Sequence, residues 1–300
     1  MDNNYKVKYI KTKHKVRKII TYNSDKKKEE HEFIAHKLSK IFTPSIFSKG
    51  YVENESIYTN AYAHLYNDVF IKLDIKDFFN SINHKLLKKI IYHELYEYIT
   101  PSDVDKLIKM CTVSSRGLPL GLKTSPILSN IYLKPFDIQL YNKLKRLKCD
   151  NIIYTRYADD MVISFKKTEN HKEIEKEILC MIDSLVQKYH LKINNKKTKI
   201  VNFENTAQVR ITGVSIVNKQ GRRRLSIGRN QKRKLFYEVI NVKKNSNIEK
   251  NHKYIQSLKG KLSFYLSIEK EDFDSFLTEK MKKEIHELGY DNFIDLVKKL

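Results

Sequence analysis

The sequence predicts an α+β protein in which a sheet-forming core is followed by a helical C-terminal unit. Three observations predict this class: a strictly alternating segment at 69–75, two β-rich runs around a pair of acids at 151–167, and a pattern that turns helical after about residue 228. With 300 residues and 41% hydrophobic content, the chain suits one compact unit with sub-domains, or at most two domains.

The first half of the chain reads as a basic β-leaning stretch, a helix, a strand and three further helices. In the strand, alternate residues are apolar while Lys72 and Asp74 share the other face, so we expect a half-buried strand with an acid on its polar side. The last helix begins at Thr124, Ser125 and Pro126, a typical start signal. The expected elements are 5–22, 29–42, 69–75, 83–99, 102–112 and 124–147.

The second half begins with a predicted hairpin at 151–167, because β-rich runs flank Ala158, Asp159 and Asp160. Residues 171–190 have apolar side chains on one helical face and predict an amphipathic helix. Two β segments should follow, around 191–202 and 209–217, before the helical C-terminal unit.

Charge gives the first indication of function. The chain has 58 Lys and Arg against 35 Asp and Glu, a formal charge of +23. A Lys-rich composition inherited from an AT-rich genome would spread this charge evenly. Instead, residues 1–28 hold ten basic and two acidic residues, residues 219–261 hold fourteen and two, and residues 269–300 are net acidic. This distribution predicts contact with a nucleic acid.

Other classes of protein are disfavoured. The sequence has no run of eighteen apolar residues and no signal-peptide pattern, so we expect no membrane contact and a cytoplasmic location. Cys111, Cys149 and Cys180 lie far apart without C-x-x-C spacing. We therefore expect thiols that act as small hydrophobes rather than a zinc site or structural disulfide.

The acids are the main candidates for chemistry. Acids are depleted in strands, and the adjacent Asp159 and Asp160 repel each other, so their place between two β-rich runs is costly. If the strand of Asp74 pairs beside the hairpin, three carboxylates meet. Mg²⁺ prefers such oxygen ligands, and two ions could activate a 3′-hydroxyl and stabilise pyrophosphate. The alternative is an ordinary Asp-rich surface turn.

Several motifs in order decide between these alternatives. Tyr157-Ala158-Asp159-Asp160 resembles the Y-x-D-D box of reverse transcriptases, and the other blocks of that family resemble segments 71–82, 117–133 and 191–201. The resemblance implies a right-hand polymerase. Its expected parts are fingers (1–66 plus 83–116), a palm (67–82 plus 117–218) and a helical RNA-binding thumb (219–300).

The resemblance also implies roles for single residues. Asp74, Asp159 and Asp160 would bind two Mg²⁺, or Mn²⁺ in their place, and Lys197 would protonate the leaving pyrophosphate. The nucleotide site would include Arg17 on the triphosphate, Phe79 as a steric gate against ribose, and Leu120 with Gly121. Leu120 departs from the usual glutamine, which leaves fidelity and template use open.

Two features resemble bacterial retron enzymes in particular. Residues 60–64 match an N-A-x-x-H signature, and 211–213 resemble a V-T-G signature with isoleucine first. Residues 258–268 resemble the retron thumb. Structural alternatives stay open: a loop histidine whose hydrogen bonds are satisfied within the protein, a β-bulge or turn at 212–213, and a solvated turn at 222–224. The expected RNA or primer contacts are Asn60, His64, Thr212, Gly213, Arg222, Arg223, Arg224, Arg229 and Lys232.

The resemblance thus implies an RNA-directed DNA polymerase that binds a cognate structured non-coding RNA and uses dNTPs. Its product would be multicopy single-stranded DNA, a branched RNA–DNA molecule primed by an internal guanosine 2′-hydroxyl. Anti-phage defence with a separate effector or toxin protein is also implied. Two alternatives stay open: a group II intron-like or abortive-infection polymerase, and a catalytically idle RNA-binding protein that keeps the palm as a scaffold. The complete set of acids argues against the latter.

Overall fold

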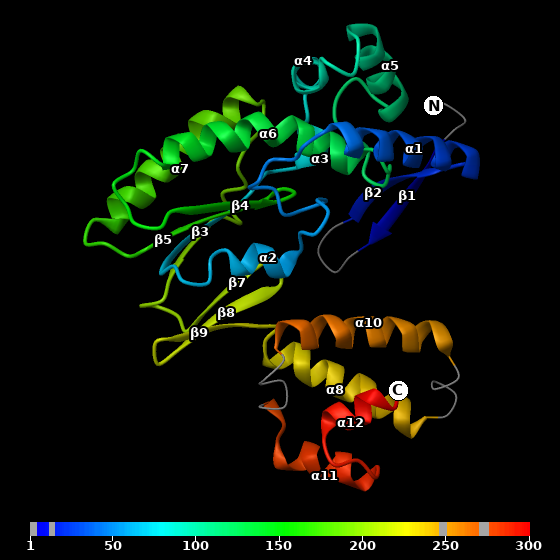
Figure 1. Ribbon diagram of the computed structural model, residues 1–300, viewed down its shortest axis with the longest axis vertical. Helices are drawn as coiled ribbons and strands as arrows, with labels where there is room; N and C mark the ends of the chain where they lie inside the picture. The colour runs from blue at the N-terminus through cyan, green and yellow to red at the C-terminus, as the bar shows by residue number, and fades with distance from the viewer. Residues whose placement is uncertain (1–4, 12–15, 246–250, 270–275) are drawn as a thin grey trace. The chain divides into compact units, whose positions relative to one another are not determined.

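The chain forms two compact units, a first unit of residues 1–206 and a second unit of residues 207–300 (Figure 1). The computed structural model describes residues 5–11, 16–245, 251–269 and 276–300. Among the described helices, none has the length and apolar character needed to cross a lipid bilayer.

The first unit begins with an antiparallel hairpin and a helix. Strands β1 (Tyr5–Lys11) and β2 (Val16–Tyr22) pair with Tyr5 opposite Tyr22, so the basic β-leaning stretch forms two strands. Helix α1 (Asp25–Ile41) begins where the Ser24 side chain accepts a hydrogen bond from the backbone N–H of Lys27. The predicted helix at 29–42 is therefore confirmed and starts one turn earlier.

A four-stranded antiparallel sheet forms the centre of the first unit. Its strand order is β4-β5-β3-β6. The predicted hairpin is confirmed as β4 (Ile153–Tyr157) and β5 (Asp160–Phe165), while the β segment expected at 191–202 contains a strand only at β6 (Lys199–Asn202). Strand β3 (Val69–Asp74) lies between β5 and β6.

Both faces of β3 are covered, so the prediction of a half-buried strand is wrong. Helices α6 (Ser125–Leu144) and α7 (His171–Lys188) lie on one face of the sheet, and the short α2 (Ile57–Tyr62) lies on the other (Figure 1). Phe70, on the α2 face, is fully buried and meets the ring of Phe203 edge-on at 5.3 Å. The alternation in sequence identified the strand, but not the second covering layer.

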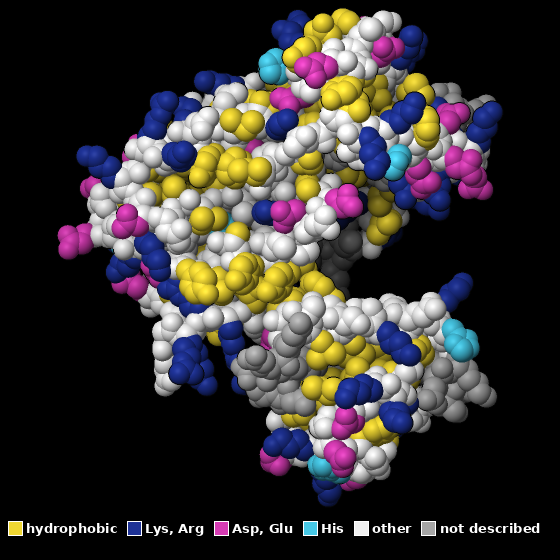
Figure 2. Space-filling model, viewed as in Figure 1, with side chains coloured by type: hydrophobic (Ala, Val, Ile, Leu, Met, Phe, Trp, Pro, Cys, Tyr) yellow, Lys and Arg dark blue, Asp and Glu magenta, His cyan; other side chains and the backbone are white. Residues whose placement is uncertain are grey.

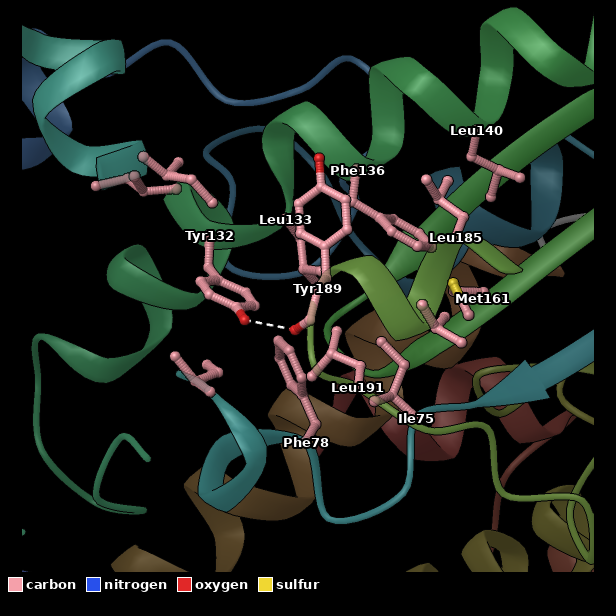
Figure 3. Packing of buried hydrophobic residues seen from close by; sticks show 14 of the residues in the cluster. Ile75, Phe78, Tyr132, Leu133, Phe136, Leu140, Met161, Leu185, Tyr189 and Leu191 are labelled. Atoms are coloured by element: carbon pink, nitrogen blue, oxygen red, sulfur yellow. Dashed lines mark hydrogen bonds between the residues drawn. The ribbon is translucent and has the colours of Figure 1, made fainter. Parts of the chain in front are cut away.

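Aromatic side chains join α6, α7 and the sheet into one core (Figure 3). The Tyr132 hydroxyl donates a 2.5 Å hydrogen bond to the backbone oxygen of Tyr189, and the Phe136 ring meets the Tyr189 ring edge-on at 5.4 Å. Met161 on β5 and Leu185 on α7 complete this layer beneath the hairpin. Such a close-packed layer gives the sheet a fixed support.

Three more helices complete the first unit. They are α3 (Phe78–Ser81), α4 (His84–Leu95) and α5 (Pro101–Cys111). A capping box between Thr100 and Asp103 starts α5, which accounts for the break between the two predicted helices.

The second unit combines a small sheet with helices. Strands β7 (Gln208–Ile211), β8 (Val214–Lys219) and β9 (Arg222–Ser226) form a three-stranded antiparallel sheet. Strand β9 was not among the expected elements, which passed from a β segment at 209–217 to a helical pattern after about residue 228. The helices that follow share a core that includes Phe236 and Phe293. They are α8 (Arg229–Lys244), α10 (His252–Ile268), α11 (Glu279–Glu287) and α12 (Phe293–Lys298).

Candidate active site

The acids predicted to bind metal lie on neighbouring strands. In the β3–β5 pair, Asp74 is directly opposite Asp160. The backbone N–H of Ile75 donates a 3.0 Å hydrogen bond to the backbone oxygen of Asp159, which ties the hairpin turn to the end of β3. The sheet register therefore brings Asp74, Asp159 and Asp160 together from positions 85 residues apart in sequence.

A tight turn presents these acids. Tyr157 pairs with Asp160, so only Ala158 and Asp159 connect β4 to β5. Ala158 has φ 57°, in the left-handed region that side chains with a Cβ seldom adopt. Its side chain is buried. The turn is therefore held in a strained conformation by its surroundings.

Asp74 has two polar partners on the loop after α7. Lys197 Nζ lies 2.5 Å from Asp74 Oδ1, and the Asn194 side-chain amide donates to Oδ2 at 3.1 Å. The backbone N–H of Asn194 also donates to the backbone oxygen of Asp74 at 2.8 Å. Lys197, predicted to act on the leaving group, is thus beside the predicted metal ligands.

The surroundings raise the proton affinity of two of the acids, Asp159 and Asp160. Burial, followed by the charges of Asp159 and Asp74, raises the pKa of Asp160 from 3.8 to about 6. Burial and then the charge of Asp74 raise the pKa of Asp159, while Lys197 and Arg17 oppose this effect. The hydrogen bond to Asp74 raises the pKa of Lys197. Such clustered perturbations are typical of functional sites.

The donor chemistry fits a divalent cation. Carboxylate oxygens are the ligands that Mg²⁺ prefers. Across the residues that the structure describes, no three His, Cys, Asp or Glu side chains are already gathered into a metal cluster. Each carboxylate oxygen of Asp74 accepts one hydrogen bond, from Lys197 or from Asn194. A carboxylate oxygen that accepts one hydrogen bond keeps a second lone pair, so both oxygens of Asp74 can still bind a cation.

The predicted nucleotide-site residues Leu120 and Gly121 lie against β2. The backbone N–H of Ile20 donates a 2.7 Å hydrogen bond to the backbone oxygen of Leu120. Gly121 has φ 106°, and a Cβ built there would lie 2.4 Å from the backbone oxygen of Ile20. Glycine is therefore required for this close approach.

The predicted steric gate, Phe79, is partly buried and packs against the core. Its ring lies 5.2 Å from that of Phe78. Its backbone oxygen accepts a 2.7 Å hydrogen bond from the N–H of Leu118, so Phe79 and the segment before Leu120 are adjacent.

A basic cavity of about 860 Å³ lies between the β1–β2 hairpin, the end of α5 and segment 116–120. Arg17, the predicted triphosphate ligand, lines it together with Leu120. Among the described residues that line the cavity, Asp77 is the single acid. The basic side chains that line the cavity are Arg17, Lys18, Lys27, Lys106, Lys109 and Arg116. This charge suits a phosphate-bearing ligand.

Two predicted RNA contacts are buried. Asn60 and His64 have no exposed surface, so direct RNA contact by either side chain is corrected to a structural role. The ring of His64 hydrogen-bonds Ser164 at 2.6 Å and Thr155 at 2.7 Å, bridging β5 and β4. Burial, followed by the charge of Lys49, lowers the pKa of His64 to about 3, so the ring is neutral at physiological pH.

One predicted contact in the second unit is buried as well. Lys232 pairs with Glu269, and both side chains are almost completely enclosed, so its assignment to RNA is also corrected. By contrast, Arg222 and Arg224 on β9 and Arg229 at the start of α8 are exposed, while Arg223 is half-buried. Figure 2 shows Lys and Arg side chains on the visible face of this unit.

Thr212 and Gly213 form the two-residue turn between β7 and β8. Both have positive φ, 44° and 100°, as a tight hairpin of this kind requires. The turn alternative is thus confirmed, and a primer contact by these residues stays a prediction.

Residues beyond the predicted set also shape the site. Asn194 holds Asp74 and lies in the N-x-x-K-T pattern, so that motif could have identified it. Arg156, beside the Y-x-D-D box, is fully buried and donates to the backbone oxygen of Ala158 at 3.2 Å. Its sequence position gave no sign of that burial.

Comparison with known proteins identifies the family. The family model described as reverse transcriptase (RNA-dependent DNA polymerase) matches residues 9–220. The chain belongs to the reverse transcriptase family. The Retron Ec73 reverse transcriptase of Escherichia coli is 29% identical to it over 288 residues, covering 88% of this chain and 86% of that relative. The Retron Ec86 enzyme of the same organism is 28% identical over 242 residues, covering 80% and 68%. This reverse transcriptase is an RNA-directed DNA polymerase of the bacterial retron group, as the sequence motifs predicted.

Solved telomerases share the fold. Telomerase from Candida albicans, in complex with a fragment of telomeric RNA, aligns with TM-score 0.56 at 13% identity, covering 98% of this chain and 60% of that chain. Apo telomerase from Candida tropicalis aligns with TM-score 0.55 at 13% identity, covering 99% and 62%. The reverse transcriptase thus spans less than two thirds of these telomerases, and the likeness concerns the fold alone. It confirms the α+β right-hand polymerase class.

Proposed function

We propose that this reverse transcriptase binds one cognate structured non-coding RNA and copies part of it into multicopy single-stranded DNA, a branched RNA–DNA molecule. The observation that carries the proposal is the pairing of Asp74 with Asp160 beside Lys197 and a basic cavity. The retron names of its relatives support this product class. The same resemblance supports a role in anti-phage defence in the cytoplasm, with an effector protein on a separate chain.

Asp74, Asp159 and Asp160 would hold two Mg²⁺ ions. The ions would lower the pKa of the attacking 3′-hydroxyl and stabilise charge on the leaving pyrophosphate. The proximity of the three acids supports this assignment, and so does the carboxyl group of Asp160 with its pKa raised to about 6. A cluster of acids that Lys197 neutralises only in part gains from a cation.

Lys197 would supply the proton for the leaving group. Its raised pKa keeps Nζ protonated at neutral pH, and its side chain is 63% exposed. Exchange of its hydrogen bond from Asp74 to a phosphate oxygen would place a charged donor on the pyrophosphate.

The basic cavity would receive the triphosphate of the incoming dNTP. Arg17 would bind phosphate oxygens through its fork of N–H groups. The ring of Phe79, next to segment 117–120, would exclude a ribose 2′-hydroxyl. Leu120 presents no hydrogen-bonding side chain where the family has glutamine, so base selection there would depend on shape.

The second unit would bind the cognate RNA. Arg222, Arg224 and Arg229 are exposed and would contact phosphates, so shape would supply much of the recognition. Under this proposal the palm ends at residue 218 and includes β7 and most of β8, while β9 and the helices that follow act as the thumb.

The test is expression of the gene with its native flanking DNA, followed by denaturing electrophoresis of the nucleic acid that co-purifies with the protein. We expect a discrete DNA band that RNase shortens and that the Asp159→Ala/Asp160→Ala variant lacks. Heterogeneous DNA, or none, from a folded and RNA-loaded wild type would reject the retron product and favour an intron-like or defence polymerase.

A further inference from the structure

A buried ion pair lies directly behind the catalytic turn. Arg156 on β4 and Asp137 on α6 both have side chains with no exposed surface. The guanidinium donates to both carboxylate oxygens of Asp137, from Nε at 2.9 Å and from Nη2 at 2.8 Å. The hydroxyl of Tyr154 donates to the same carboxylate at 2.8 Å. The carboxylate is therefore fully engaged and fixes the plane of the guanidinium.

The remaining guanidinium nitrogen reaches the turn. Arg156 Nη1 donates to the backbone oxygen of Ala158 at 3.2 Å and to Asn130 Oδ1 at 3.1 Å. Asn130 also lies on α6, and its amide donates to the backbone oxygen of Gly50 at 2.9 Å. The pair thus connects helix α6 with the residue that precedes Asp159.

Gly50 supports Ala158 from another direction. The loop before it runs beside β4, where the N–H of Lys49 donates to the backbone oxygen of Arg156 at 2.7 Å. A Cβ on Gly50 would lie 2.7 Å from the backbone nitrogen of Ala158, so backbone packs on backbone here. Ala158 is consequently enclosed and bonded while in its left-handed conformation.

Stability alone does not explain a buried charge pair. Two charges lose their hydration on burial, and an apolar pair of similar volume is often as stable or more so. What apolar side chains cannot provide is a directed hydrogen bond to the Ala158 oxygen. The backbone oxygen of Asp159 is meanwhile held by the N–H of Ile75, which directly follows β3. The two bonds together fix the turn on both sides of the Asp159 carboxylate.

We propose that Arg156, held in place by Asp137, is a positioning residue that keeps Ala158 left-handed and thereby sets the carboxylate of Asp159. The inference rests on the proposed role of Asp159 in nucleotidyl transfer. Displacement of a reacting group by about 1 Å can cost ~100-fold in rate. Loss of the pair should therefore slow chemistry in molecules that remain folded.

Three variants separate positioning from stability. Arg156→Lys keeps a buried cation opposite Asp137 but removes the planar fork. Arg156→Met/Asp137→Leu removes both charges and leaves neither unpaired. Leu185→Ala is the matched control. Leu185 is 1% exposed in the same core, and its side chain has no group that could form a hydrogen bond with the turn.

The measurement is single-turnover addition of one dNTP to a pre-annealed DNA primer on an RNA template. Its amplitude reports the folded, active fraction, and its rate constant reports chemistry in that fraction. We expect both Arg156 variants to lower the rate constant about 10- to 100-fold, with dNTP affinity little changed. Leu185→Ala should lower the amplitude and Tm only. Wild-type rate constants in both Arg156 variants would overturn the proposal.

A second measurement is independent of activity. Crystal structures of the two Arg156 variants should show Ala158 outside the left-handed region and the Asp159 carboxylate displaced. An unchanged turn would overturn the proposal even if the rates fell. Failure of the proposed function has a different signature: Asp159→Asn would then retain wild-type extension, whatever the Arg156 variants do.

Discussion

Lys197 Nζ lies 2.5 Å from Asp74 Oδ1, so the predicted proton donor is paired with a predicted metal ligand. The ammonium neutralises part of the charge that the three acids concentrate. Because the Lys197 side chain is 63% exposed, this pair contributes little to stability. Under the proposed function, the pair keeps the Lys197 ammonium protonated and close to the reacting groups.

Lys197→Met should slow nucleotide addition by ~100- to 10,000-fold, the usual contribution of a general acid. Tm should change little. Lys197→Arg is the informative comparison, because arginine can still pair with Asp74 but does not release a proton at neutral pH. If the Lys197→Arg variant shows the wild-type rate in single-turnover assays, Lys197 acts through its charge and not as an acid.

Asp160→Asn should abolish DNA synthesis while the variant still retains its RNA. The change keeps the size of the side chain but removes the negative charge that a cation requires. Gel-based extension and filter binding of RNA report the two properties separately. DNA synthesis at the wild-type level would show that Asp160 is not a metal ligand.

The raised pKa of Asp160 predicts two pH effects. Synthesis should decline as pH falls through about 6, because the protonated acid no longer competes for a cation. In the metal-free protein, folding stability changes with pH in the opposite direction. The folded state binds the proton more tightly than the unfolded state, so stability falls as pH rises from 3.8 to about 6 and stays lower above.

Asp160→Asn should therefore raise the stability of the metal-free protein near pH 7.5. The gain should be ~1 kcal/mol, because the side chain of Asp160 is accessible to solvent even though its carboxyl group lies among buried neighbours, so the shift is discounted for screening. Near pH 4 the two proteins should unfold alike. Thermal unfolding of the wild type and the variant at both pH values, with and without Mg²⁺, measures this difference in stability. A stabilisation that persists at low pH would point to a cause other than the charge.

Phe79→Ala should allow ribonucleotides to be incorporated, because removal of the ring opens space beside the sugar. Phe79→Tyr keeps the ring and should keep the selectivity. The ratio of dATP to rATP incorporated opposite the same template base measures this selectivity. An unchanged ratio in the Ala variant would dismiss the steric-gate role, since Phe79 also packs against the core and could serve that purpose alone.

Arg222→Ala/Arg224→Ala should weaken RNA binding and reduce its dependence on salt by ~1 unit of slope per lost phosphate contact. Lys232→Met should behave differently. It leaves Glu269 buried without its cation, so it should destabilise the second unit by ~3–5 kcal/mol and leave the salt slope unchanged. Equal slopes for the two variants would argue against RNA contacts on β9.

Local patterns were enough to predict the catalytic strands. Alternation identified β3, and the flanking β-rich runs identified the hairpin that carries Asp159 and Asp160. The strand β9 was missed because Arg222, Arg223 and Arg224 are polar in succession, which hides the period of two. Hydrogen bonding to β8 holds this segment as a strand even though its sequence does not alternate.

The buried polar groups could not be predicted because their partners are distant in sequence. His64 bonds residues 100 and 91 positions away, and only the folded sheet brings Ser164 and Thr155 to its two ring nitrogens. Burial likewise turns Lys232 from an expected RNA contact into the partner of Glu269. A motif identifies such a residue as important without saying which neighbour it meets.

The bond between Ile20 and Leu120 has a mechanical consequence. Arg17 lies on the same strand as Ile20, and Gly121 leaves no gap between that strand and the segment after Pro119. A hinge motion of the hairpin alone would break this bond and expose backbone groups. Any displacement of the hairpin that preserves this bond therefore moves the strand and segment 119–121 together. Because Leu120 takes part through its backbone oxygen, substitution of its side chain leaves this connection in place.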